Sequence, residues 1–206
     1  MVRTLLAAIF AASVPSLALA ELRLPELPSL SSVLEKVQIR SERMRVSLDI
    51  RGYFNGDRYD LRDSLARIDM EVSRESGGKG FRFSGDVDGR YLSGRVESRN
   101  DGSWEIWGGG LNVDMRKRGA GDYEISGFVD EAEGSRHMDV TLRQRGMPGN
   151  FSVWENGANI DISRFASTTS LSGEIELSRF GKKSLALVSV YVAVLESQLD
   201  KPQSGR

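Results

Sequence analysis

From Arg43 onward apolar and polar residues alternate along the chain, and this period of two constrains the fold more than any other feature. The runs RMRVSLDI (43–50), IDMEV (68–72), LNVDM (111–115) and HMDVTL (137–142) carry an apolar residue at every second position. Successive side chains of a β-strand point to opposite faces. Each run therefore predicts a strand with one apolar face and one face rich in Arg, Asp, Glu and Ser.

Short turn-forming stretches separate these runs. Examples are NGD (55–57), RNDG (99–102) and ENGAN (155–159). Strands that follow one another through such turns, with no helix between them, predict an antiparallel up-and-down meander. We expect an all-β fold of about 10–12 short strands, with one short N-terminal helix, that forms a strongly curved sheet or a lipocalin-like barrel.

The first 20 residues, MVRTLLAAIFAASVPSLALA, have the organisation of a secretory signal peptide. Arg3 supplies a basic start, an apolar core follows, and Ala18-Leu19-Ala20 matches the small-x-small cleavage pattern. The apolar core is too short for a membrane span. The segment predicts export to the periplasm or beyond the cell, with insertion into an outer membrane as the less favoured alternative.

The rest of the chain divides into three parts. Residues 21–42 are expected to form an extended lead-in, kept open by Pro25 and Pro28, and a short amphipathic helix. Residues 43–197 are expected to form a single antiparallel β domain, and residues 198–206 a disordered tail. The last apolar run, LALVSVYVAVLES (185–197), predicts a fully buried strand, with a C-terminal helix as the alternative.

Glycine recurs on the apolar face of five predicted strands. These glycines are Gly52, Gly85, Gly94, Gly127 and Gly173. Each lies two residues from an apolar residue and therefore, by alternation, on the same face as that residue. Glycine lets a strand bend sharply, and this is the favoured interpretation. The alternative is that the missing side chains leave a cavity for a large side chain or an apolar ligand, to which Trp104 and Trp107 would also contribute.

Trp104 and Trp107 are three positions apart. Because this spacing is odd, they lie on opposite faces of their predicted strand. One is expected in the core and the other exposed as a contact residue for lipid, sugar or protein. The triple glycine 108–110 that follows is either a hairpin turn or a bend within one strand. If it is a turn, a strict meander gathers at one end a basic rim, made of Arg116, Lys117, Arg118, Arg143 and Arg145, that suits an anionic membrane surface.

The residues that carry enzyme chemistry are sparse. The chain has no cysteine, and its one histidine, His137, cannot form a catalytic triad or a His-rich metal site alone. Asp86-Val87-Asp88-Gly89 lacks the remaining ligands of a calcium loop and predicts a turn. A net charge of −1 gives no attraction to nucleic acid. We therefore expect no enzyme activity, no cofactor, no metal and no nucleic-acid partner.

Two functions fit this description. The first is an exported, non-enzymatic β-barrel-like protein that binds an apolar or amphiphilic ligand such as a lipid. The alternative is an envelope structural or interaction module with a packed core that acts through its rims or edges. A small outer-membrane barrel is the less favoured third possibility, because runs such as WEIW (104–107) are shorter than the strands that span a membrane. The choice between the first two depends on whether the interior is empty.

Overall fold

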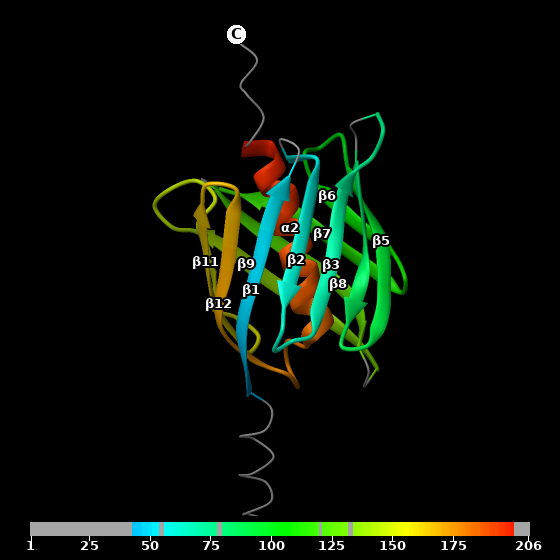
Figure 1. Cartoon of the computed structure of the whole chain (residues 1–206), viewed down its shortest axis with the longest axis vertical. Coiled ribbons are helices and arrows are strands. Elements are labelled where there is room, and N and C mark those ends of the chain that lie inside the picture. Colours follow the sequence, from blue (N-terminus) through cyan, green and yellow to red (C-terminus); the bar gives the residue numbers. More distant parts are fainter. Residues whose placement is uncertain (1–42, 54–55, 78–79, 120, 132–133, 200–206) are drawn as a thin grey trace, which may run out of the picture.

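The described part of the chain folds into a closed antiparallel barrel of twelve strands around a helix. Figure 1 shows how the strands surround the helix. The computed structural model describes residues 43–53, 56–77, 80–119, 121–131 and 134–199. The predicted signal peptide and the predicted N-terminal helix lie outside the described residues. The meander and the barrel are confirmed, and the helix that the described residues contain is C-terminal.

The strands follow one another around the wall in chain order. They are β1 (Arg43–Tyr53), β2 (Arg58–Asp63), β3 (Ile68–Arg74), β4 (Gly80–Val87), β5 (Arg90–Ser98), β6 (Trp104–Gly108), β7 (Leu111–Arg118), β8 (Asp122–Glu131), β9 (Gly134–Gln144), β10 (Phe151–Val153), β11 (Ala158–Phe165) and β12 (Thr168–Glu176). Every pairing is antiparallel between sequence neighbours, and β1 pairs with β12 from Arg43↔Glu176 to Arg51↔Thr168 to close the barrel.

Alternate turns lie at the same end of the barrel because every connection reverses direction. We call the end where β1 finishes the upper rim and the end where β1 begins the lower rim, as oriented in Figure 1. The triple glycine is a hairpin turn, since Gly108 pairs with Leu111 and Gly109 and Gly110 form the two-residue loop. Both loop glycines have positive φ (62° and 80°), as a tight β-hairpin requires.

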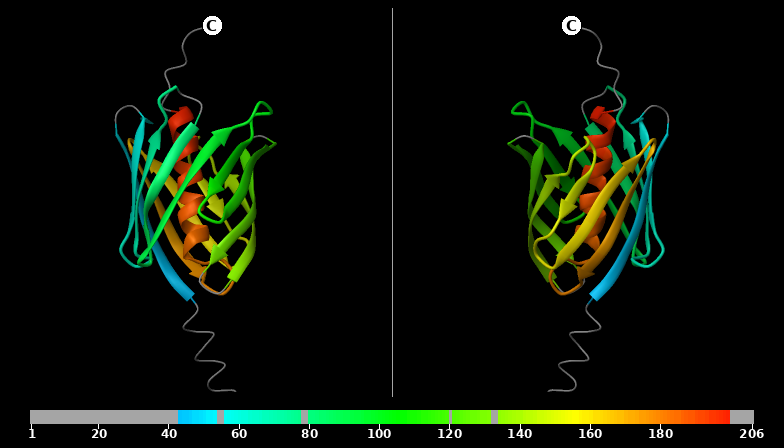
Figure 2. Two further views of the ribbon diagram at one scale, coloured as in Figure 1. Left: turned by 90° about the vertical axis from the view of Figure 1, so that its right-hand side faces the viewer. Right: turned by 90° about the vertical axis from the view of Figure 1, so that its left-hand side faces the viewer.

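The last apolar run is a helix and not the buried strand that we expected. Helix α2 (Lys182–Leu199) starts at the lower rim and runs up through the barrel interior, as Figure 2 shows from two sides. Every residue from Ser184 to Ser197 is buried. A helix that is apolar on all sides must be surrounded by protein, and the barrel wall surrounds this one.

The backbone explains why a valine-rich run becomes helical here. By the time the chain reaches Lys182, β1 and β12 have closed the sheet, so the barrel offers no edge for a thirteenth strand. Buried N–H and C=O groups must still find partners. A helix satisfies them within itself, and at about 1.5 Å per residue its 18 residues span about 27 Å. Closure of the sheet thus overrides the strand preference of valine.

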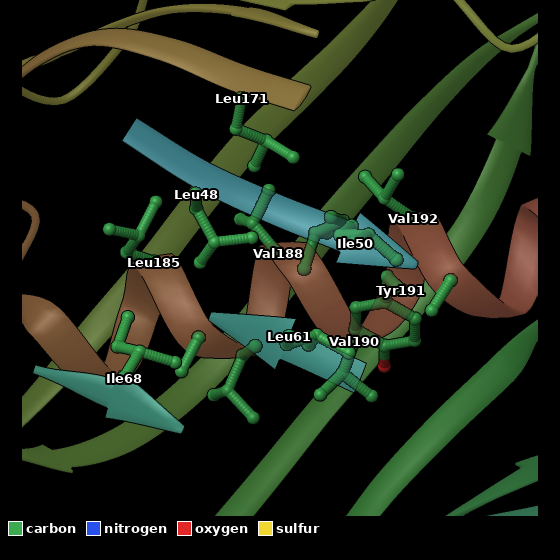
Figure 3. Packing of buried hydrophobic residues seen from close by; sticks show 14 of the residues in the cluster. Leu48, Ile50, Leu61, Ile68, Leu171, Leu185, Val188, Val190, Tyr191 and Val192 are labelled. Carbon is green, nitrogen blue, oxygen red and sulfur yellow. The ribbon is translucent and has the colours of Figure 1, made fainter. Parts of the chain in front are cut away.

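The core lies between α2 and the inward faces of the strands. Figure 3 shows Leu48, Ile50 and Leu61 from the wall together with Leu185 and Val188 from the helix. The polar groups of α2 have partners inside the core. The Tyr191 hydroxyl donates to the Val113 carbonyl at 2.6 Å, and Ser189 Oγ donates to the Leu185 carbonyl at 2.8 Å. Apolar packing and satisfied polar groups together specify one position for the helix.

The wall is weakest next to β10, which has only three residues. It pairs with β9 only at Phe151↔Gln144 and Ser152↔Arg143, so β9 below Arg143 has no strand neighbour on that side. Side chains of the β10–β11 turn replace the missing strand. Glu155 accepts a hydrogen bond from the Thr141 amide at 3.2 Å, and the Asn156 side chain donates to the Asp139 carbonyl.

All five glycines singled out from the sequence lie within strands on inward positions, and neighbouring atoms fill the space beside them. The Phe83 ring covers Gly94, and the Tyr59 ring lies against Gly52, with the nearest ring carbons 2.6 and 3.1 Å from where a Cβ would be. Aromatic rings across from glycine stabilise bent sheets in this way.

At Gly127 the backbone itself requires glycine. Its φ is +154°, and a Cβ would lie 2.6 Å from Val113 Cα and closer still to the carbonyl oxygen of Asn112. Gly85 and Gly173 are in the same situation against β3 and β11. At these three positions the close approach of the neighbouring strand therefore requires glycine. The curvature that we expected of them stays a prediction.

We predict that Gly127→Ala lowers the free energy of unfolding by about 3 kcal/mol or more, because the added Cβ forces β7 and β8 apart. Gly89→Ala is the control. It also has positive φ, but no atom lies within 4 Å of its Cβ position, so it should cost about 1–2 kcal/mol. Urea denaturation measures both. Equal losses would contradict a steric role for Gly127.

We predict that Tyr191→Phe destabilises the protein by about 1–2 kcal/mol, because the buried Val113 carbonyl loses a hydrogen bond. Burial raises the pKa of Tyr191 well above its ordinary value, so the hydroxyl remains a donor at physiological pH. Tyr91→Phe, at an exposed hydroxyl, should leave the unfolding midpoint unchanged. Equal effects of the two substitutions would show that the Tyr191–Val113 hydrogen bond does not stabilise the position of α2.

Candidate functional site

The barrel interior is occupied by α2, so the predicted cavity residues surround a helix. Gly52, Gly85, Gly94, Gly127 and Gly173 face inward from the wall. Side chains or backbone of the adjacent strands meet each of them, as described above. The pockets considered below are lined by other residues.

The two tryptophans divide as their spacing predicts. Trp104 is partly buried against the core, with its ring centroid 6.0 Å from that of Phe81. Trp107 points outward, is 42% exposed, and lies beneath the Arg95 guanidinium at 5.5 Å. Phe128 and His137 form a second outward aromatic contact, with ring centroids 5.1 Å apart. The outer wall thus presents isolated aromatic contacts between charged neighbours.

The five basic-rim residues lie near the upper rim, on β7 and around the end of β9. Four of them form ion pairs with neighbouring carboxylates. The pairs are Arg116–Asp114 (3.6 Å), Arg118–Glu124 (2.5 Å), Arg143–Glu155 (2.5 Å) and Arg145–Asp161 (3.2 Å). Exposed pairs of this kind contribute at most about 1 kcal/mol each, so these arginines exchange partners at low cost.

The separation of charge between the two ends is smaller than the turn pattern suggested. A meander that treats residues 55–63, with Asp57, Asp60 and Asp63, as one turn would place these three acids opposite the basic rim. Arg58–Asp63 instead form β2. Asp57 consequently lies at the upper rim, where it pairs with Arg74 at 2.9 Å. Asp63 is inward and buried, and its carboxylate accepts hydrogen bonds from the amides of Ser47 and Ala66 at 2.9 Å each.

An apolar patch beside the basic rim was not foreseen from the sequence. We call Met147, Pro148, Phe165 and Leu199 the upper patch. Met147 is 71% and Phe165 86% exposed, and Leu199 at the end of α2 is 44% exposed. Met147 and Pro148 line a pocket of about 300 Å³ together with Asn150, Arg164 and Ala166.

Local hydrogen bonds hold the segments of the upper patch together. The Asn150 side-chain oxygen accepts from the Arg164 amide at 2.8 Å, and the Asn150 amide donates to the Met147 carbonyl at 3.2 Å. The Leu199 side chain lies 3.4 Å from the position that a Cβ would take at Gly149, so the end of α2 lies against the β9–β10 turn. Arg145 extends the surface, since its guanidinium stacks 4.0 Å from the exposed Trp154 ring.

A second pocket, of about 230 Å³, opens at the lower rim where α2 begins. It is lined by Val87, Asp88, Arg90, Glu131, Arg136, Leu177, Gly181, Lys182 and Lys183. The DVDG stretch is a hairpin turn, as predicted, closed by a 2.7 Å hydrogen bond from the Gly89 amide to the Asp86 side chain. Asp88 bonds Lys182 at 2.8 Å, and this hydrogen bond holds the pKa of Asp88 below its ordinary value.

Lys182 and Lys183 were not predicted as site residues, because the helix that places them beside this pocket was only the alternative expectation for the run 185–197.

Comparisons with protein-family models, with curated proteins and with solved structures found no match to this chain. In the part of the chain that the structure describes, no group of three or more His, Cys, Asp and Glu residues is arranged to hold a metal ion. Within the same ranges no helix has the length and apolarity needed to cross a membrane. The candidate binding features of the described residues are thus the upper patch and the pocket at the lower rim.

We predict that Asp88→Asn lowers the melting temperature at pH 7 by at most about 4 °C, since its ion pair is exposed. A carboxylate with a depressed folded-state pKa stabilises above its unfolded pKa, and this contribution is lost as pH falls through the lower folded value. The difference between wild type and variant should thus close below about pH 4. Asp69→Asn, which removes an exposed pair with Arg62, controls for loss of charge alone. A difference independent of pH would contradict the assignment.

Proposed function

We propose that this chain is an exported, non-enzymatic interaction module that docks on an anionic lipid surface through its upper rim. The observation that carries the proposal is the upper patch, an exposed apolar surface at the tips of three segments beside arginine side chains. A protein that lies on a membrane combines these two features, because apolar side chains enter the headgroup boundary while cations bind lipid phosphates.

The packed interior supports contact through the outside of the barrel. An apolar ligand inside the barrel would need the volume that α2 fills with residues Ser184 to Ser197. A carrier function therefore requires α2 to leave the core, which would expose a helix that is apolar on every side. Binding at the rim requires no such rearrangement.

The polar outer wall supports a barrel that works in water. Outward positions carry charged residues around the wall, for example Arg45 on β1, Glu71 on β3 and Arg82 on β4. The outer face of a membrane-spanning barrel is instead an apolar band about 25 Å tall. We accordingly propose contact with the membrane surface rather than insertion of the barrel.

The arginines near the upper patch are suited to this contact. Arg143 and Arg145 are paired with Glu155 and Asp161 on the exposed wall, where such pairs are weak. Phosphate oxygens can replace these carboxylates as partners of a guanidinium. Trp154 under Arg145 adds a ring of the kind enriched at membrane–water interfaces.

We predict that the purified chain 21–206 sediments with vesicles containing phosphatidylglycerol and much less with pure phosphatidylcholine vesicles. Replacing Met147 and Phe165 together by Ser should weaken binding by at least tenfold, since a buried Phe side chain contributes about 1.5–3 kcal/mol. Higher salt should weaken binding to the anionic vesicles.

Phe128→Ser is the matched control, because Phe128 is 56% exposed on the wall near the opposite rim. It should sediment like the wild type. The docking proposal would be overturned if Phe128→Ser weakened vesicle binding as much as the double variant does. It would also be overturned if the wild-type protein did not bind anionic vesicles. Native mass spectrometry of protein purified from its own envelope covers the carrier alternative, which requires a lipid-sized adduct.

A further inference from the structure

The lower pocket combines a cavity with an excess of positive charge. Its lining includes four cations, Arg90, Arg136, Lys182 and Lys183, and two carboxylates, Asp88 and Glu131. The formal charge of the lining is thus +2 (4 − 2). These residues come from the β4–β5 hairpin, β8, β9 and the start of α2, so the fold brings together cations that are far apart in the sequence.

Both carboxylates have structural partners. Asp88 binds Lys182 at 2.8 Å, and Glu131 accepts hydrogen bonds from the amide and hydroxyl of Ser184 at 3.2 and 3.3 Å. Glu131 thereby fixes the start of α2 against the end of β8. Asp88 forms a neutral pair with Lys182, and the other three cations together with Glu131 give the lining its formal charge of +2.

The cations are held in place by neutral or flexible contacts. Lys183 Nζ donates to the Asp130 carbonyl, and Arg136 donates to the Leu177 carbonyl at 3.1 Å. A carbonyl partner orients a cation without cancelling its charge. Arg90 is exposed on the hairpin at the mouth of the pocket. Arg90 and Lys183 therefore line the pocket from two separate elements, the β4–β5 hairpin and the start of α2.

We propose that the lower pocket binds a phosphate monoester. A guanidinium donates two parallel hydrogen bonds to a phosphate, and an ammonium group adds a compact charge. The pocket of about 230 Å³ has room for a phosphate with a short substituent. Val87 and Leu177 provide an apolar side for that substituent. The phosphate belongs either to a free small molecule or to a lipid headgroup.

Isothermal titration calorimetry of the chain 21–206 with sn-glycerol 3-phosphate tests the proposal, with inorganic phosphate and sodium acetate titrated in parallel. We expect saturable binding of glycerol phosphate, weaker binding of phosphate and none of acetate. Replacing Arg90 and Lys183 together by Gln should weaken glycerol phosphate binding by at least tenfold. Arg90→Gln alone, at an exposed position that does not disturb folding, should weaken it by a smaller factor.

Arg58→Gln is the matched control, since it removes an arginine from the opposite end of the wall. It should bind glycerol phosphate like the wild type. Titration with short-chain phosphatidic acid below its micelle concentration distinguishes a lipid headgroup from a free small molecule as the source of the phosphate. Tighter binding than glycerol phosphate identifies a lipid, and equal affinity identifies a free phosphate monoester.

A wild-type protein that binds none of the phosphate compounds, or Gln variants with wild-type affinity, would overturn the proposal. This result is independent of vesicle docking by the upper patch. The Met147 and Phe165 variants should retain glycerol phosphate binding, and the Arg90 and Lys183 variants should retain vesicle binding. Loss of both activities in both sets would instead indicate general misfolding, which thermal denaturation detects.

Discussion

Pairing of β1 with β12 closes the sheet, and the remaining organisation of the molecule depends on this contact. Apart from the stretch around the short β10, closure leaves no free strand edge of the kind through which β proteins aggregate. It also leaves an interior that twelve inward strand faces cannot fill alone. Helix α2 fills this space, and its backbone satisfies its own hydrogen bonds because the wall offers none. The helix and the closed wall therefore require each other.

The alternation of apolar and polar residues was sufficient to predict the antiparallel meander, since a period of two determines which face of each strand is buried. It left a curved sheet and a closed barrel both open. It could not predict α2. The run 185–197 is apolar on all sides, and a buried strand and a buried helix look alike by that criterion. The helix is favoured because the sheet closes at Arg43↔Glu176. This contact joins residues far apart in the sequence, and no local pattern reveals it.

The candidate sites were less accessible to sequence reasoning than the fold. Glycine spacing identified inward positions where neighbouring rings or backbone leave no room for a side chain, and the odd spacing of Trp104 and Trp107 separated an inner from an outer ring. The upper patch escaped notice because Met147, Phe165 and Leu199 belong to three segments that meet only in space. Their single apolar residues look unremarkable in turns and at an element end. The lower pocket required the helix start for the same reason.

The position of α2 at the end of the chain has a consequence for how the protein comes to be folded. The segment that fills the core is synthesised after every strand of the wall, and the strand that closes the wall precedes it by only a few residues. A chain emerging N-terminus first can pair neighbouring hairpins early, yet both the closing partner of β1 and the contents of the barrel arrive at the end. Contacts between such distant residues slow folding. Until β12 and α2 have been synthesised, the open meander exposes apolar faces and two free edges, so the nascent chain is at its most vulnerable to aggregation and proteolysis in that interval.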